Sequence, residues 1–283
     1  MRFMINFLHT YQPNPILISF GPIQIHWYGL FIVTGTLLAI LVTIKLARFY
    51  KIKAEIIIDL AFWLIIFGLI GARLYHVLIE LPYYLQHPLE IFYLWQGGLA
   101  IHGAIIAGII TIWFYAKKKR LNFWQLTAVI APGLALAQAI GRWGNYFNQE
   151  LFGLPTNLPY GIPIDLINRP LEYLNYNYFQ PTFLYESLGD FIIFIILLST
   201  HLYILKKVTS CELRVMDYKL LVISYLILYS SARYLIEFIR IDSTPIIFNL
   251  RFPQITSLII IFFSLIYLIC IFFKKRRNKI LQL

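Results

Sequence analysis

The chain alternates between long apolar runs and short polar connections along its whole length. A membrane-spanning helix needs about 20 largely apolar residues, and seven runs meet that length. The predicted spans cover residues 18–44, 56–79, 97–116, 124–146, 182–205, 217–239 and 254–273. This pattern predicts an all-α integral membrane protein with about seven transmembrane helices, forming one polytopic domain over residues 1–283.

Residues 147–181 interrupt the series of spans. They combine many Asn and Tyr residues with several prolines, at positions 155, 159, 163, 170 and 181. Frequent proline and asparagine predict an irregular segment, and a loop of this length is usually functional. We therefore expect residues 147–181 to form a cap inserted between two spans, on the outer side of the membrane.

Lys and Arg concentrate in alternate connections between the predicted spans, at residues 45–53, 117–120, 206–219 and 274–279. The positive-inside rule places these clusters in the cytoplasm, with the N-terminus outside and the C-terminus inside. Basic residues assigned to the outer half are all arginine. Planar recognition of carboxylate or phosphate favours arginine over lysine, so the outer half is the side to search for a site.

Composition narrows the class of protein further. The chain is 60% hydrophobic and 13% charged, whereas soluble domains carry about 25% charged residues. A net charge of +11 would fit nucleic acid, but the basic residues sit in short clusters between apolar runs, so no nucleic acid partner is expected. Cys211 and Cys270 have no metal-ligand spacing and fall toward the cytoplasmic side, and no metal or cofactor is expected. The polar N-terminal stretch shows no removable signal peptide.

The most informative run, residues 138–153, closes the fourth predicted span. It places four polar side chains within nine positions: Arg142, Asn145, Asn148 and Glu150. A charge at the centre of a membrane helix costs about 2.5–3.5 kcal/mol unless it faces a polar cavity or a partner. Gly141, Gly144 and Gly153 allow close backbone approach. A guanidinium beside amides and exposed backbone N–H groups suits a ligand that carries a phosphate.

Charged residues also interrupt other predicted spans. Arg73 lies about two turns from an outer end, and either a structural ion pair with Glu80 or a functional role fits it. His102 lies one to two turns inside an outer end and is of the type that titrates near neutrality, although a lone histidine is more often a packing residue.

The sixth predicted span ends in a charged sequence. Spacings of four and three place Arg233, Glu237 and Arg240 on one helical face. That face must look into the bundle or a wet cavity, either as a structural ion-pair ladder or as part of a site. Arg169 and Arg251 fall on outer loops without such a pattern, so we expect lysine at either position to leave activity close to that of wild type.

Several of these motifs resemble those of bacterial prolipoprotein diacylglyceryl transferases, in the same order along nearly the entire chain. Residues 141–153 match the family's Gly-Arg-x-Gly-Asn-x-x-Asn-x-Glu-Leu-x-Gly at every fixed position. His-Trp-Tyr-Gly at 26–29, Gly-Gly-x-x-x-His-Gly at 97–103 and Arg-x-x-x-Glu-x-x-Arg at 233–240 match as well. Residues 180–186 resemble the family's His-Pro-x-Gln-Leu-Tyr-Glu but depart from it at Gln180 and Phe183, so the resemblance implies no role for these two. Ala104 stands where the family often has glycine.

The resemblance implies transfer of the diacylglyceryl group of phosphatidylglycerol to the lipobox cysteine of a prolipoprotein signal peptide, forming a thioether and releasing glycerol phosphate. It implies a multi-pass protein of the bacterial inner membrane, in contact with membrane lipids and with its site facing the periplasm. His102 is then the plausible base for the thiol. Glu150 as the base, or a thiolate that forms unaided, are the alternatives.

The remaining roles follow from the same resemblance. Arg142 and Arg233 would stabilise the leaving phosphate, and Glu237 would orient an arginine. The expected substrate-binding residues are Arg142, Asn145, Tyr28, Arg73, Asn148, Glu150, Gly153 and Arg240. Tyr185 and Glu186 are secondary candidates.

Two other classes of protein share some of these features. A lipid transporter would also bury charges, but repeated halves and broken helices are not visible in the sequence. A lipid phosphatase would need a nucleophilic His or Asp, or a metal, beside the arginines.

Overall fold

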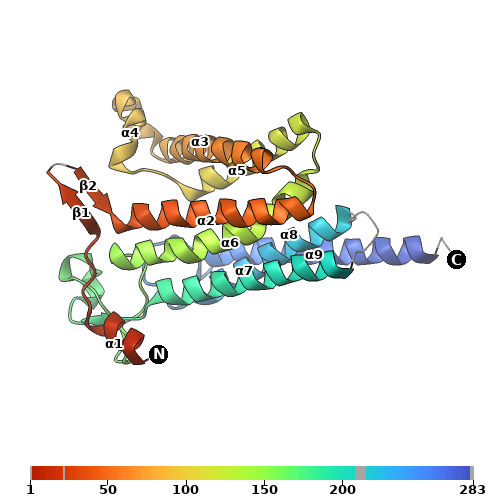
Figure 1. The fold of residues 1–283 in the computed structure, drawn as a ribbon. Coiled ribbons are helices and arrows are strands. Elements are labelled where there is room, and N and C mark those ends of the chain that lie inside the picture. Colours follow the sequence, from red (N-terminus) through yellow and green to blue (C-terminus); the bar gives the residue numbers. More distant parts are fainter. Residues whose placement is uncertain (1, 22, 208–214, 281–283) are drawn as a thin grey trace. The chain divides into compact units, whose positions relative to one another are not determined.

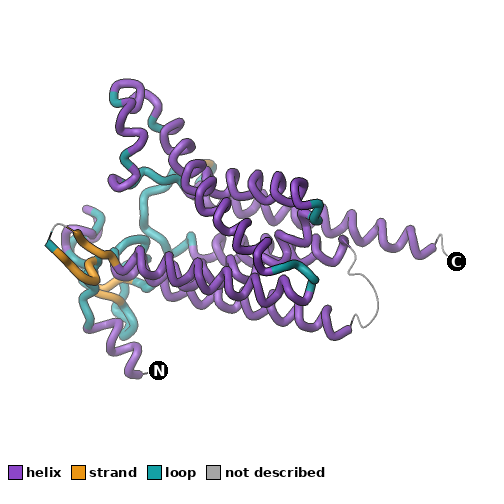
Figure 2. Tube along the Cα trace, turned by 45° about the horizontal axis from the view of Figure 1, so that its top comes forward, coloured by secondary structure: helices purple, strands orange, loops and turns teal. Residues whose placement is uncertain are grey.

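A computed structural model describes the chain except for residues 1, 22, 208–214 and 281–283 (Figure 1). The helices are α1 (Arg2–Thr10), α2 (Trp27–Phe49), α3 (Ala54–Ile79), α4 (Leu81–Gln86), α5 (Ile101–Lys119), α6 (Phe123–Phe147), α7 (Thr182–Lys207), α8 (Val215–Ile236) and α9 (Phe252–Ile280). Short 3-10 turns cover Pro88–Phe92, Leu94–Gln96, Leu166–Asn168 and Leu171–Tyr173. Helix therefore dominates the described chain (Figure 2).

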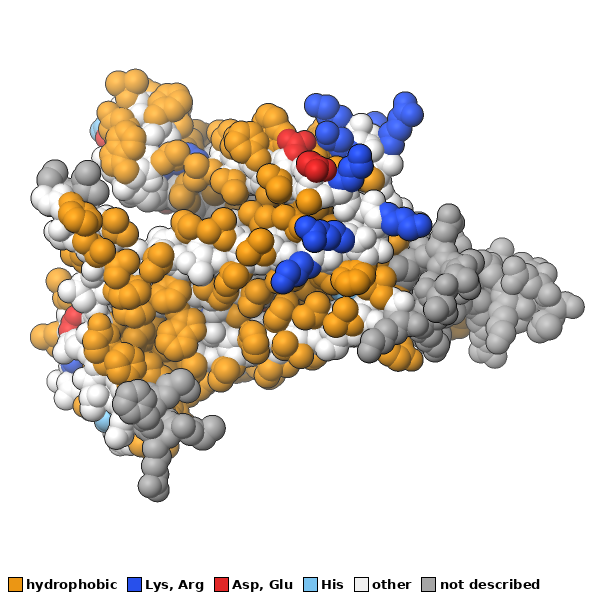
Figure 3. All heavy atoms as spheres, viewed as in Figure 1, with side chains coloured by type: hydrophobic (Ala, Val, Ile, Leu, Met, Phe, Trp, Pro, Cys, Tyr) orange, Lys and Arg blue, Asp and Glu red, His pale blue; other side chains and the backbone are white. Residues whose placement is uncertain are grey.

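The prediction of an all-α integral membrane protein is confirmed. Six helices of the described chain are long and apolar enough to span a membrane: α2, α3, α6, α7, α8 and α9. Hydrophobic side chains cover much of the face seen in Figure 3, as expected of a surface that meets lipid. The predicted third span is helix α5, which is not among the six; its 19 residues have a length of about 28 Å, close to the thickness of the hydrocarbon core.

The predicted start of the first span at residue 18 is wrong. Strands β1 (Ile16–Phe20) and β2 (Ile23–His26) form an antiparallel hairpin there, and the helix begins only at Trp27. Both strands are rich in isoleucine, so their apolar run continues into the helix without a change in hydropathy. The turn at Gly21, where φ is +60°, separates them.

The described residues group into two compact units, 1–39 with 131–283 and 40–130. The one polytopic domain over 1–283 stays a prediction.

The smaller unit contains the antiparallel pair α3 and α5. A Cβ added at Gly103 would overlap the carbonyl oxygen of Gly71, so the two backbones touch there, as small residues allow in membrane helices. At the other end of the pair, Tyr115 donates to Asp59 (2.8 Å) and Lys119 pairs with Asp59 at 3.6 Å.

These contacts bring the start of α3 and the end of α5 together. The basic clusters that adjoin them, residues 45–53 and 117–120, therefore lie at the same end of the unit, and Lys and Arg side chains gather toward this end in Figure 3. This placement agrees with their predicted location on one side of the membrane. The orientation of the termini stays a prediction.

In the larger unit, α6, α7, α8 and α9 run side by side with the first half of α2 (Figures 1 and 2). Ser187 of α7 donates to the carbonyl of Ala139 in α6 (2.8 Å), and Tyr225 of α8 donates to Gln138 (2.9 Å). Helix α6 is thus tied to both α7 and α8, close to the level of its Gly141–Phe147 end.

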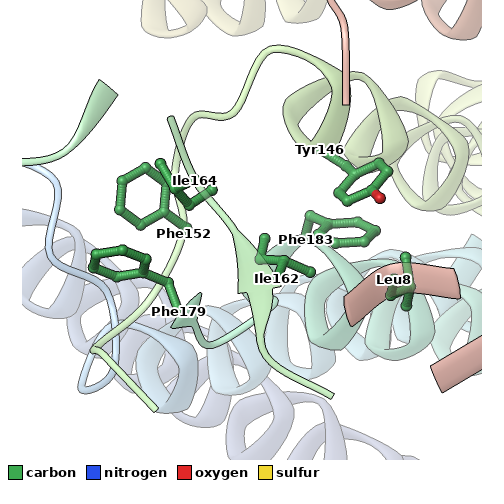
Figure 4. Packing of buried hydrophobic residues seen from close by; sticks show 7 residues of the cluster. All are labelled: Leu8, Tyr146, Phe152, Ile162, Ile164, Phe179 and Phe183. Atoms are coloured by element: carbon green, nitrogen blue, oxygen red, sulfur yellow. The ribbon is translucent and has the colours of Figure 1, made fainter. Parts of the chain in front are cut away.

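Residues 147–181 form a largely irregular segment, which we call the cap, and it packs around an apolar cluster (Figure 4). Its place on the outer side of the membrane stays a prediction. Strands β3 (Ile162–Pro163) and β4 (Tyr178–Phe179) pair within it, and the buried cluster comprises Leu8, Tyr146, Phe152, Ile162, Ile164, Phe179 and Phe183. Leu8 comes from α1, which the sequence did not predict as part of the cap. Phe183, at which the chain departs from the family pattern, is buried in this cluster.

Candidate active site

A cluster of arginines and carboxylates lies in the larger unit, where α6, α7 and α8 meet the cap. Its arginines are Arg142 in the last turns of α6, Arg233 in the last turn of α8, Arg240 just beyond α8, and Arg251 in strand β6 (Leu250–Arg251). Its acids are Glu186 and Asp190 in the first turns of α7, and Glu237 and Asp242 after α8. All eight are linked by the ion pairs described next.

Glu186 is the centre of the cluster. Its Oε1 accepts hydrogen bonds from Nη1 of Arg233 and Nη1 of Arg240, both at 2.9 Å. Its Oε2 lies 3.0 Å from Nε of Arg142, so three arginines from separate segments of the chain converge on one carboxylate. The residue is 4% exposed. A charge buried to this extent is tolerated only because its partners compensate for lost hydration.

Arg142 leaves part of its guanidinium open. Only its Nε makes ion pairs in the described structure, with Glu186 at 3.0 Å and more weakly with Asp190 at 3.9 Å. Within the residues described, no hydrogen bond uses either Nη, and the side chain is 20% exposed. The fork formed by the two Nη groups is the geometry that binds phosphate through two parallel hydrogen bonds.

Both Nη groups of Arg233, in contrast to those of Arg142, pair with carboxylates. Its Nη1 binds Glu186, and its Nη2 lies 2.7 Å from Oε2 of Glu237, one helical turn further on. Glu237 is fully buried, and its other oxygen lies 2.7 Å from Nε of Arg251. Glu237 thus contacts two arginines, Arg233 and Arg251. That it orients an arginine for the reaction stays a prediction.

Arg240 and Arg251 share Asp242. Arg240 donates through Nε to Asp242 (2.7 Å), and Arg251 donates through Nη2 to the backbone carbonyl of Asp242 (2.6 Å). Burial alone would raise the pKa of Asp242, but the hydrogen bond and charge of Arg240, together with Arg251 and Arg233, hold that pKa below its usual range. Asp242 is therefore a carboxylate at neutral pH.

One expectation about this region is wrong. Helix α8 ends at Ile236, so Arg240 does not continue the helical face on which Arg233 and Glu237 pair at a spacing of four residues. Arg240 instead forms a backbone bridge with Gly153 of the cap, and Glu186 brings it to Arg233. Arg251 pairs with Glu237 and hydrogen bonds to the carbonyl of Arg240, contacts that the sequence pattern did not indicate.

The 141–153 run folds back on the end of α6. The Glu150 backbone N–H donates to the carbonyl of Asn145 (3.0 Å), and the Glu150 carboxylate accepts from the side chains of Asn145 (2.7 Å) and Asn148 (3.4 Å). The ring of Tyr28 lies against Gly144, where an added Cβ would overlap it. Tyr28, Asn145, Asn148 and Glu150 thus belong to one neighbourhood next to Arg142.

Gly153 has a packing role. It donates to the carbonyl of Gln180 (2.9 Å), and an added Cβ would lie 3.0 Å from the carbonyl oxygen of Ile239, from Gln180 and from Thr182. Three segments meet at this glycine, which couples the cap to Arg240. Binding of substrate by Gly153 stays a prediction.

Arg73 lies in the smaller unit and does not pair with Glu80 in the described structure. Its guanidinium donates to the backbone carbonyls of Ile91 (2.8 Å), Gly97 (2.8 Å), Gly98 (3.0 Å) and Glu90. Four of its five donors therefore hold the segment between α4 and α5, which gives Arg73 a structural role. Its expected contact with substrate stays a prediction.

His102 also lies in the smaller unit, in the first turn of α5. Its ring is exposed and lies 5.8 Å from the ring of Tyr75 in α3. The adjacent Gly103 packs against Gly71, so the first turn of α5 is held firmly on α3. Among the described residues, no group of three or more His, Cys, Asp or Glu could hold a metal ion. Of the cysteines, Cys270 is free and exposed, and Cys211 lies outside the described residues.

Some of these contacts are not indicated by the sequence motifs. Glu186 was only a secondary candidate, and Asp190 and Asp242 were not singled out. Asp190 could have been found, because it lies four residues after Glu186 in a predicted helix and so shares its face.

The fold and this cluster define a multi-pass membrane protein whose polar site of arginines and carboxylates lies beside an irregular cap. The chain belongs to the prolipoprotein diacylglyceryl transferase family, because that family's model matches residues 15–270. The predicted family and enzyme class, a transferase, are therefore confirmed.

Curated proteins with this family's name are similar to the chain over nearly its full length. Proteins called phosphatidylglycerol--prolipoprotein diacylglyceryl transferase from Nostoc sp. and from Trichormus variabilis are each 42% identical over 98% of this chain and 95% of their own. The protein of that name from Synechococcus elongatus is 42% identical over 94% of this chain and 90% of its own.

Proposed function

We propose that this chain transfers the diacylglyceryl group of phosphatidylglycerol to the lipobox cysteine of prolipoproteins. The curated relatives carry this lipid and this kind of acceptor in their name. The observation in this chain that supports the proposal most directly is the open fork of Arg142 at the edge of a buried arginine cluster. A lipid whose head group carries a phosphate diester is a natural ligand for such a fork.

The phosphate would bind the two Nη groups of Arg142, with Arg233 and Arg240 behind it. Both Nη groups of Arg233 already pair with carboxylates, so Arg233 has no free pair of donors for the phosphate. We assign it electrostatic stabilisation of the phosphate from a distance and positioning of the neighbouring side chains. Asn145, Asn148, Glu150 and Tyr28 lie beside Arg142 and would contact the glycerol head group through amide, carboxylate and hydroxyl groups.

In the reaction, the cysteine sulfur attacks the terminal glyceryl carbon that bears the phosphate. A carbon–sulfur bond forms, the carbon–oxygen bond breaks, and its electron pair stays on the phosphate oxygen. The products are a thioether and glycerol phosphate, and the thiol proton passes to a base. Charge on the phosphate grows as the bond breaks, so donors fixed beforehand on that phosphate stabilise the transition state more than the ground state.

We propose His102 as the base that takes the thiol proton. Imidazole titrates near neutrality, whereas an unperturbed thiol has a pKa near 8.5. The carboxylate of Glu150, the alternative base, already accepts hydrogen bonds from the side chains of Asn145 and Asn148 on its Oε1, so that oxygen is engaged within the protein.

The enzyme would act in the bacterial inner membrane with its site open to the periplasm. The cap and the arginine cluster lie where α6 ends and α7 begins. The basic residues that precede α6 and those at the end of α7 belong to the opposite ends of these two helices. Reporter fusions test this: one after Lys118 should remain cytoplasmic, and one near Asn168 of the cap should be exported. A cytoplasmic reporter at Asn168 would contradict the proposed side.

The reaction is tested with purified protein in phosphatidylglycerol vesicles and a lipobox peptide. Mass spectrometry should find the peptide heavier by one diacylglyceryl group on its cysteine, with glycerol phosphate released. A peptide with serine in place of the cysteine should remain unmodified. Free diacylglycerol or inorganic phosphate without modified peptide would favour a lipid phosphatase and contradict the proposal.

A further inference from the structure

Among the described acids of the cluster, Glu186 is the one that links Arg142 to other arginines. Its carboxylate lies 3.0 Å from Nε of Arg142 and also binds Arg233 and Arg240. Glu237 contacts Arg233 and Arg251, and Asp242 contacts Arg240 and Arg251, but neither reaches Arg142. The position of Arg142 relative to the other arginines therefore depends on Glu186.

The contact with Arg142 is made on one edge of the guanidinium. Glu186 and, one helical turn later, Asp190 both face Nε. A guanidinium is planar and rigid, so fixing Nε also fixes the direction of the two Nη groups. The carboxylates thus restrict the direction in which the open fork of Arg142 can point.

The same carboxylate controls how strongly the cluster attracts anions. Three guanidinium groups within contact of one point would repel each other strongly in a site of low dielectric. Glu186 is 4% exposed, so water does not screen its charge. It therefore reduces the positive potential that a phosphate meets, both for the substrate and for a product that carries more charge.

We propose that Glu186 is the positioning residue of the phosphate site: it aims Arg142 at the phosphate and weakens the site's hold on the glycerol phosphate product. This inference rests on the proposed function. A merely structural ion pair would hold the helices together without affecting the balance between substrate and product binding.

The test uses purified full-length variants in phosphatidylglycerol vesicles with the lipobox peptide. Glu186→Gln keeps the size of the side chain and removes its charge. We expect kcat to fall about 100-fold because Arg142 is no longer held, as for loss of one aligned donor. We also expect glycerol phosphate to inhibit at about tenfold lower concentration, because a buried negative charge has been removed.

Two further variants separate orientation from charge. Glu186→Asp keeps the charge but shortens the side chain, so kcat should fall while the inhibition constant of glycerol phosphate stays near that of wild type. Asp242→Asn is the matched control, since it removes a carboxylate of the same cluster that does not touch Arg142. Its inhibition constant should change less than that of Glu186→Gln.

The outcomes decide the proposal in either case. Unchanged kcat in Glu186→Asp would overturn the orientation role, and inhibition unchanged or weakened in Glu186→Gln would overturn the charge role. If Glu186→Gln does not fold, tighter inhibition in Glu186→Asp would overturn the charge role in its place. Calorimetric binding of glycerol phosphate gives an independent readout. Tighter binding to Glu186→Gln than to wild type would support Glu186 even if wild type formed no thioether.

Discussion

Arg251 and Glu237 form an ion pair, with Nε of the arginine 2.7 Å from Oε1 of a fully buried carboxylate. The two residues come from opposite sides of a short hairpin connection between α8 and α9. This pair extends the arginine cluster to the base of strand β6, where Arg251 also binds the carbonyls of Arg240 and Asp242.

Replacement of Arg251 by lysine should therefore reduce both stability and activity. Lysine keeps the charge, but it cannot serve Glu237 and two carbonyls at fixed angles. Loss of such charge-assisted hydrogen bonds costs about 1.5–3 kcal/mol each in mutational series. Thermal unfolding in detergent should show a lower midpoint, with transferase activity reduced about tenfold.

Arg48→Lys is the control for this variant. Arg48 is an exposed arginine in the last turn of α2 and should tolerate lysine without loss. An Arg251→Lys protein as stable and active as Arg48→Lys would show that the pair with Glu237 has no energetic importance.

The same exchange at Arg142 should act on rate more than on stability. Its Nη groups have no partner among the described residues, and the Glu186 carboxylate that its Nε contacts keeps Arg233 and Arg240 as partners, so we expect only a modest loss of stability. It does forfeit bidentate contact with phosphate. Loss of a donor that stabilises the transition state costs about 10²- to 10³-fold in rate. Peptide modification should fall accordingly at near-normal abundance, and full activity would remove Arg142 from the phosphate site.

Packing of α3 on α5 gives a prediction with a control in the same helix. A Cβ at Gly71 would lie 2.7 Å from the carbonyl oxygen of Gly103 and would overlap Ala107, whereas a Cβ at Gly68 meets nothing within 4 Å. Gly71→Ala should separate the helices and cost about 1–3 kcal/mol. Gly68→Ala should be neutral or slightly stabilising. Equal unfolding midpoints for the two variants would contradict the close contact.

The pKa of Asp242 predicts a dependence of stability on pH. Because that pKa is held below its unfolded value, Asp242 stabilises the fold above the usual aspartate pKa of about 3.9, and this contribution is lost as pH falls through the lower folded value. Wild type should therefore exceed Asp242→Asn in unfolding midpoint at pH 6 to 7. The gap should narrow as the pH is lowered below about 4. A constant gap across that range would mean that the charge is not what stabilises the fold.

Much of the helical architecture could be predicted because apolar runs of spanning length have few alternatives in a bilayer. The boundaries of α3, α6 and α7 fall within two residues of the predicted spans. The first span failed because the β hairpin at Ile16–His26 is as apolar as the helix that follows. Hydropathy measures burial in lipid or protein and does not distinguish strand from helix in a short run.

The site was predicted only in part, for a related reason. Arg142, Arg233 and Glu237 stand out in the sequence because charges are rare within apolar runs. The partners of Arg73 are backbone carbonyls, which every residue carries, so no pattern of side chains could indicate them. The central place of Glu186 depends on α6, α7 and α8 meeting in space, which the sequence of one helix does not contain.

Replacement of His102 by glutamine tests the proposed base. Glutamine keeps a hydrogen-bonding side chain of similar reach but cannot accept a proton near pH 7. Activity at neutral pH should fall by about 10²- to 10⁴-fold, the usual contribution of general base catalysis. The loss should shrink as pH rises toward and beyond the thiol pKa near 8.5, because the peptide cysteine then ionises without help. Rates of peptide modification between pH 6.5 and 9.5 provide the measurement, with the thermal midpoint recorded to confirm the fold. A variant with full activity and no change in pH profile would exclude His102 as the base, whereas a loss that is equal at every pH would mean that His102 binds or orients substrate without taking the proton.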